Sequence, residues 1–126
     1  MKKLLIVLGL LTSSIAMPAV IQVEPAMAAV TLSKLGDLSG MREIVADTFT
    51  LVEAGKIQDA VKRITEFETA WDHNEKKLRK LDTETWRKID EASDVALSTV
   101  RYPSATPDDM KKDLSDLIAV LDNPSL

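Results

Sequence analysis

Four carboxylates in the middle of the chain come closest to forming a chemical site. Asp72 and Glu75 lie three positions apart, and Asp90 and Asp94 lie four apart. On a helix, residues at these spacings share a face. Carboxylate oxygens are the ligands that a hard cation such as Ca²⁺ prefers. Asp72, Glu75, Asp90 and Asp94 are therefore the candidate metal ligands, and an ordinary surface network of ion pairs is the alternative.

The choice depends on how two helices meet. With Trp71 and Trp86 as the inward directions of two antiparallel helices, the carboxylates lie on flanks of the same sign. Such flanks either face each other or both face away, and the sequence leaves both possibilities open. Facing flanks place Glu75 level with Asp90. The ion pairs expected in that case are Glu75–Arg87 and Arg79–Asp90. Glu68 would be a fifth carboxylate on the same seam, and the surplus acids expected to hold the cation are Asp72, Asp94 and Glu75.

The single histidine, His73, is the other candidate ligand. It lies about 200° around the helix from Trp71, so we expect it to face water. Residues 52–56, followed by a helix that ends in Trp71-Asp72-His73, resemble the last helix of periplasmic cytochrome b562. That resemblance implies haem held by His73 and either Met41 or Met110. Haem ligation needs an inward-facing ligand, so we expect no cofactor.

Composition excludes several kinds of catalytic site. The chain has no Cys and one His, which excludes thiol nucleophiles, thiolate zinc sites and two-histidine metal sites. No glycine-rich phosphate loop is present. Six basic residues surround one turn, and the acids among them are expected to form three i,i+4 ion pairs: Asp72–Lys76, Glu75–Arg79 and Glu84–Lys88. These basic residues are Lys76, Lys77, Arg79, Lys80, Arg87 and Lys88. A patch that binds an anion or a partner is the alternative. We expect a protein that is not an enzyme.

The N-terminal segment has the pattern of a secretory signal peptide. Lys2 and Lys3 precede apolar residues, and Ala26-Met27-Ala28 forms a cleavage site. Residues 1–28 are the predicted signal peptide, and an uncleaved anchor is the alternative. The expected location is periplasmic or secreted. Cleavage leaves a net charge of −5, which disfavours nucleic acid and anionic lipid. We expect a protein or small ligand of the envelope as partner, and no membrane contact after cleavage.

The rest of the chain predicts an all-α protein, an antiparallel up-down four-helix bundle. Apolar residues recur at helical spacing over 38–54, 57–81, 82–102 and 107–122. Gly55 is placed to end the first helix, and Thr106-Pro107 to begin the last. Residues 29–37 are expected to form a loosely attached arm, and residues 38–126 the bundle domain.

Three segments resemble small exported helical proteins of bacteria. They are Trp71-Asp72, Trp86-Arg87-Lys88-Ile89-Asp90 and Ala96-Leu97. The resemblance spans about residues 45–121. It implies an exported helical bundle and no particular activity. The expected function is a non-enzymatic periplasmic bundle that acts by binding or interaction, for example as an accessory of an envelope system. A cation- or haem-binding protein is the alternative.

Overall fold

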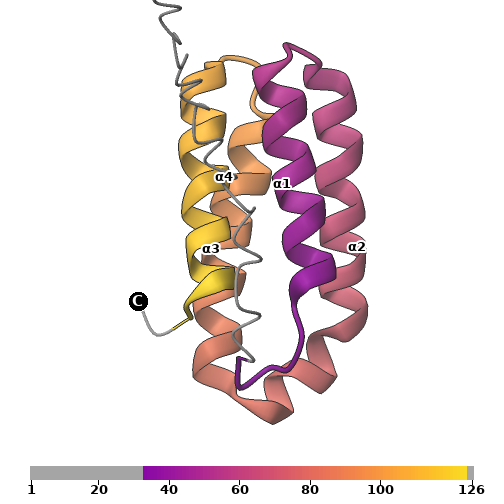
Figure 1. Ribbon diagram of the computed structural model, residues 1–126, viewed down its shortest axis with the longest axis vertical. Helices are drawn as coiled ribbons and strands as arrows, with labels where there is room; N and C mark the ends of the chain where they lie inside the picture. Colours follow the sequence, from indigo (N-terminus) through magenta and orange to yellow (C-terminus); the bar gives the residue numbers. More distant parts are fainter. Residues whose placement is uncertain (1–32, 125–126) are drawn as a thin grey trace, which may run out of the picture.

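The computed structural model describes residues 33–124, which form four α-helices. These are α1 (Ser39–Glu53), α2 (Ile57–Leu81), α3 (Thr83–Arg101) and α4 (Pro107–Asp122). Each helix packs against the next one in the chain, and α4 returns to pack against α1. The result is the predicted antiparallel bundle (Figure 1). No helix of the described part of the chain is long and apolar enough to cross a membrane.

The turns between the helices have clear local causes. Gly55 has a φ of 72°, the left-handed conformation that glycine tolerates best, and the amide of Lys56 closes the end of α1 on the Leu51 carbonyl at 2.9 Å. At the start of α3, the Asp82 carboxylate accepts a bond from the Thr85 amide at 2.8 Å. A reciprocal capping box between Thr106 and Asp109 begins α4. These caps fix the helix lengths and hence which residues lie level with one another.

The core consists of one apolar stripe from each helix. The largest fully buried apolar side chains are Phe67, Ile64, Ile89, Leu114, Leu117, Val45, Val52 and Val100. Two hydroxyl groups are buried among them, those of Thr48 and Ser93. They donate to backbone carbonyls one turn earlier, at 2.8 and 2.7 Å. The helical faces predicted from the sequence are therefore largely the buried ones, and they leave the charged flanks of α2 and α3 outside the core.

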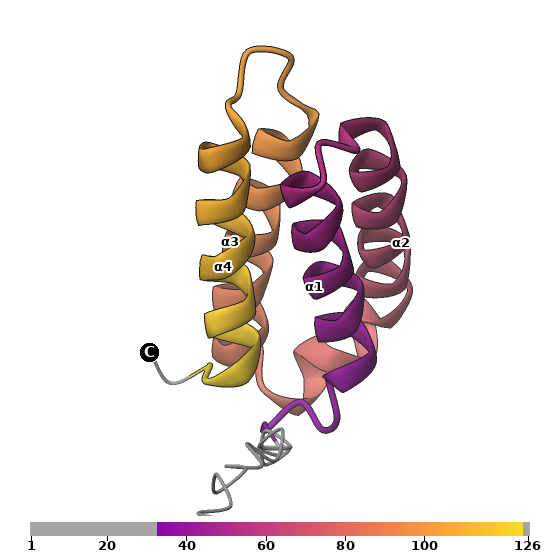
Figure 2. The ribbon, with the colours of Figure 1, turned by 45° about the horizontal axis from the view of Figure 1, so that its top comes forward.

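The described part of the predicted arm is docked and not loose, which corrects the expectation for residues 33–37. Leu35 and Leu38 are only 4% and 8% exposed and belong to the core. Gly36, with a φ of 86°, makes the tight turn that folds the segment back. Lys34 lies 3.5 Å from the Asp82 carboxylate at the α2–α3 turn. The described chain therefore begins at the same end of the bundle as that turn (Figures 1 and 2).

Leu81 also departs from expectation. The apolar spacing of residues 57–81 predicts that Leu81 belongs to the inward stripe. Leu81 is instead the last residue of α2, and its side chain is 53% exposed. The helix ends there, and the following residue turns away with extended backbone. The buried stripe of α2 therefore ends at Leu78, three residues before the helix does. The predicted signal peptide, residues 1–28, lies outside the described residues.

Candidate functional site

The charged flanks of α2 and α3 face each other. The Trp71 indole nitrogen on α2 donates a hydrogen bond to the Asp90 carboxylate on α3 at 2.9 Å. Beside this bond, four carboxylates and Arg101 line one hollow of about 520 Å³. We call these carboxylates the acidic seam: Glu68, Asp72, Asp90 and Asp94. The two arrangements left open by the sequence are thus resolved in favour of facing flanks.

A stack of planar groups supports the seam from inside. The rings of Phe67 and Trp71 lie 6.0 Å apart, and those of Trp71 and Trp86 lie 6.4 Å apart and nearly parallel. The Arg79 guanidinium lies 4.9 Å from the Trp86 ring and extends the stack. Trp71 and Trp86 come from different helices, so the stack fixes how α2 and α3 meet. The Trp86 indole nitrogen is buried and has no acceptor among the described residues.

The seam carries more negative than positive charge. Arg101 is the cation that lines it, and its guanidinium lies 2.6 Å from the Glu68 carboxylate. Arg101 also donates to the Thr65 hydroxyl at 3.0 Å. Partial loss of hydration raises the pKa of Asp94, and the carboxylates of Asp90, Asp72 and Glu68 raise it further. Three carboxylates therefore remain without a cationic partner in the seam.

The structure gathers three of the four predicted metal ligands and leaves the fourth outside. Asp72, Asp90 and Asp94 line the seam, whereas Glu75 pairs with Arg79 at 3.2 Å. The expected Glu75–Arg87 and Arg79–Asp90 pairs do not form. Arg87 instead binds two acids of its own helix, Glu84 and Glu91, each at 2.5 Å. Within residues 33–124 no three acidic or histidine side chains are arranged to hold a metal ion, and the proposed ligand set stays a prediction.

His73 is exposed on α2, as its helical angle predicts. One of its possible haem partners, Met110, is buried at the opposite end of the bundle against Ile57. His73 lies 16 residues beyond Ile57 on α2, which corresponds to about 24 Å along the helix. His73 and Met110 are therefore too far apart to bind the same haem iron. The other, Met41, is partly buried and packs against the core.

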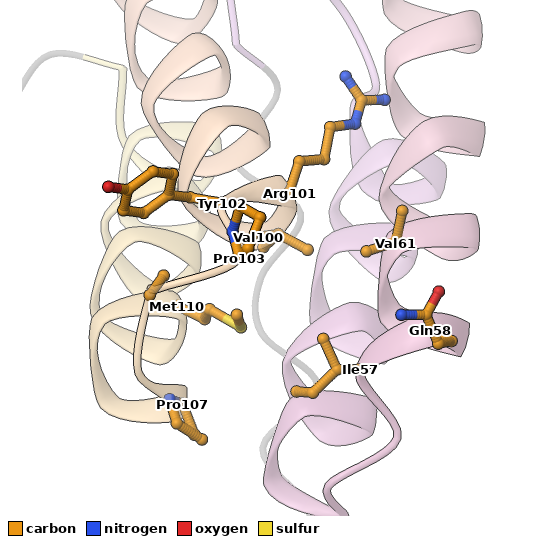
Figure 3. Close-up of a pocket in the computed structure, with 10 residues that line it drawn as sticks. Ile57, Gln58, Val61, Val100, Arg101, Tyr102, Pro103, Pro107 and Met110 are labelled. Atoms are coloured by element: carbon orange, nitrogen blue, oxygen red, sulfur yellow. The ribbon is translucent and has the colours of Figure 1, made fainter.

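A second hollow, of about 380 Å³, lies at the end of the bundle where α2 begins and α3 joins α4 (Figure 3). Ile57 and Val61 of α2 lie on one side, with Val100 and Met110 facing them. The polar side chains of Gln58, Tyr102 and Arg101 also line it. The sequence analysis missed this apolar cleft, although the prolines at 103 and 107 mark the loop that closes it.

Unpaired lysines gather at the α2–α3 turn. Nine lysines belong to the described residues, and three of them have a carboxylate within 4.0 Å: Lys34, Lys111 and Lys112. Two of the other six, Lys56 and Lys62, lie near the start of α2. The remaining four flank the α2–α3 turn, and we call them the lysine end: Lys76, Lys77, Lys80 and Lys88. The expected Asp72–Lys76 and Glu84–Lys88 pairs do not form at this distance.

No family model matches the chain, and neither a curated protein nor a solved structure was found to be similar to it.

Proposed function

We propose that this protein is an exported, non-enzymatic helical bundle that acts by binding in the cell envelope, and that the α2–α3 hairpin is its binding surface. The observation that carries the proposal is the separation of charge along that hairpin. Surplus carboxylates gather at its middle, in the acidic seam, and unpaired lysines gather at its turn. The partner would be a protein or a small ligand of the envelope.

Separated charge needs an explanation because it does not help the fold. A surface that serves only solubility intersperses the two signs. Here the pKa of Asp94 is raised first by its partial burial and then by the neighbouring carboxylates of Asp90, Asp72 and Glu68. Lys76 and Lys80 have an unfavourable i,i+4 spacing of like charges. Complementary charge on a partner would relieve both kinds of repulsion and would also steer its approach.

The remainder of the molecule supports a binding role. Arg42 pairs with Asp122 between α1 and α4, and Arg63 pairs with Asp47 between α1 and α2. These pairs balance charge on the other faces. The sequence of residues 1–28 supports export, and the net charge of −5 disfavours nucleic acid as the partner.

Site-specific photo-crosslinking in intact cells tests this proposal. A photoreactive residue would replace Thr69 or Ser98, which are exposed on α2 and α3 beside the seam. Ser115 and Ala119, exposed on α4, are the matched controls. We expect a discrete adduct from the hairpin positions and none from α4. Equal yields from all four positions, or adducts from α4 alone, would contradict the proposal.

A further inference from the structure

We propose that the lysine end docks on an anionic phospholipid surface, with Leu81 at the point of contact. This inference rests on the proposed binding role of the α2–α3 hairpin and names the partner of its turn. It also revises the expectation, based on net charge, that anionic lipid is disfavoured. The net charge is a property of the whole molecule, whereas only one end of the bundle would contact a lipid surface.

The first observation is the local charge. Residues 76–88 contain six basic and two acidic side chains, a net charge of +4, so the rest of the mature chain carries −9. Both acids of this segment are already engaged, Asp82 with Lys34 and Glu84 with Arg87. Both of its arginines are also engaged, Arg79 with Glu75 and Arg87 with Glu84 and Glu91, so the unpaired charges are the four lysines of the lysine end. An anionic surface would attract the turn and repel the rest of the molecule, and the two effects together would orient the bundle with its turn toward the lipid.

The second observation is the apolar group at the tip. Leu81 is the last residue of α2 and is 53% exposed, between Lys80 and Asp82. An exposed leucine next to basic side chains combines the two contributions that hold proteins at membrane interfaces, apolar burial and attraction to anionic lipid. Helix-dipole compensation explains basic residues in the last turn of α2, Arg79 and Lys80. It does not explain Lys76, Lys77 or the exposed leucine.

The third observation is where the chain enters the fold. Residue 33 lies at the end of the bundle that carries the lysines, close to the α2–α3 turn (Figure 2). The apolar residues 4–23 precede it in the sequence. If they are retained as an anchor, the chain passes from them into the described fold at the end of the bundle that carries the lysines. If they are removed after Ala28, the new α-amino group precedes Ser33 by four residues in the sequence and adds one positive charge to the chain.

Vesicle co-flotation tests the inference. The probe is the chain from Ala29 to Leu126, which contains the whole bundle, with vesicles of phosphatidylcholine alone or mixed with phosphatidylglycerol. We expect binding to the mixed vesicles only, weakening as salt rises. Lys77→Gln/Lys80→Gln should weaken it about 25-fold, because each lysine near an anionic surface contributes about fivefold. Leu81→Ser should weaken it without changing its salt dependence.

The matched control is Lys56→Gln/Lys62→Gln, which removes two unpaired lysines at the other end of the bundle. It should change vesicle binding less than twofold. No binding to anionic vesicles, or equal losses in the two double variants, would overturn the inference. A salt-sensitive dimer in sedimentation that is lost in Lys77→Gln/Lys80→Gln would instead assign this end to a second copy of the chain. None of these results bears on whether photo-crosslinking from Thr69 and Ser98 gives adducts. The failure of this inference can therefore be distinguished from the failure of the proposed function.

Discussion

The Trp71 indole nitrogen and the Asp90 carboxylate are joined across α2 and α3 by a hydrogen bond of 2.9 Å. The bond is only partly buried, at the boundary between the aromatic stack and the acidic seam. It therefore links the packing of the two helices to the position of a charged group. The seam has its shape because an inward aromatic residue of one helix reaches an outward acid of the next.

Removing the Trp71 side chain should destabilise the bundle strongly. Trp71 is 3% exposed and stacks on both Phe67 and Trp86. We expect Trp71→Ala to lower the free energy of unfolding by about 3–5 kcal/mol, the usual cost of deleting a buried aromatic side chain. His73→Ala, two residues away on the exposed face, should cost under about 0.5 kcal/mol. Urea unfolding of both variants measures the difference, and equal effects would show that the helix is oriented differently.

The hydrogen bond can be separated from the ring. Trp71→Phe keeps an aromatic ring but removes the N–H group that donates a hydrogen bond to the Asp90 carboxylate. In a double-mutant cycle with Asp90→Ala, we expect a coupling free energy of about 1 kcal/mol, in the range for a hydrogen bond at a partly exposed site. Chemical unfolding of the four proteins gives the coupling. Additive losses would mean that the bond contributes nothing in solution.

Crowding of the seam acids predicts a particular pH dependence. The pKa of Asp94 is raised in the folded protein, so its ionised form is less favourable there than in the unfolded chain. Asp94→Asn should raise the free energy of unfolding at pH 7 by up to about 0.5 kcal/mol, a value typical of exposed positions. This gain should shrink as pH falls through the raised pKa and vanish below about pH 3, where wild-type Asp94 is protonated in both states.

Asp116→Asn is the control for that measurement. Asp116 lies on α4 and accepts from Lys112 at 2.8 Å, away from the seam. Its neutralisation should not stabilise the protein at pH 7. Thermal melts between pH 3 and pH 7 give both profiles. If the increase in the free energy of unfolding caused by Asp94→Asn persists unchanged to pH 3, the increase does not come from removing the charge of Asp94.

Export predicts a defined N-terminus. The Ala26-Met27-Ala28 pattern follows a basic and then an apolar stretch, so cleavage should leave Ala29 first. Intact-mass measurement on protein recovered from the envelope fraction would show residues 29–126. A mass that matches residues 1–126 would identify the segment as a retained anchor.

The fold could be predicted from the sequence because its signals are local. Gly55, the Asp82 cap and the Thr106-Pro107 pair each determine a helix boundary within a few residues of chain. Apolar spacing then assigns the buried faces, and short turns force neighbouring helices to be antiparallel. Residues 33–37 were misjudged because a single leucine, Leu35, followed by Gly36 gives no periodic pattern, and it is contact with the core of the bundle that buries Leu35.

The site could be predicted only in part because it depends on contacts between helices. Helical angles place Asp72, Asp90 and Asp94 on flanks of one sign, but the handedness of the turn decides whether those flanks meet. Glu75 and Arg79 form an ion pair within α2. Because they pair with each other, neither forms the expected ion pair with α3. The apolar cleft near Met110 is built by a loop and three helix ends, and apolar spacing gives no signal for such an arrangement.

Lysine footprinting in the native envelope tests the central claim, that the α2–α3 hairpin is the working surface. An amine-reactive reagent would label intact envelopes and the purified protein in parallel, and mass spectrometry would compare each site. The account predicts protection of Lys76, Lys77, Lys80 and Lys88 in the envelope, with Lys56 and Lys62 labelled equally in both samples. Equal labelling of all six lysines, or protection of Lys56 and Lys62 alone, would contradict it.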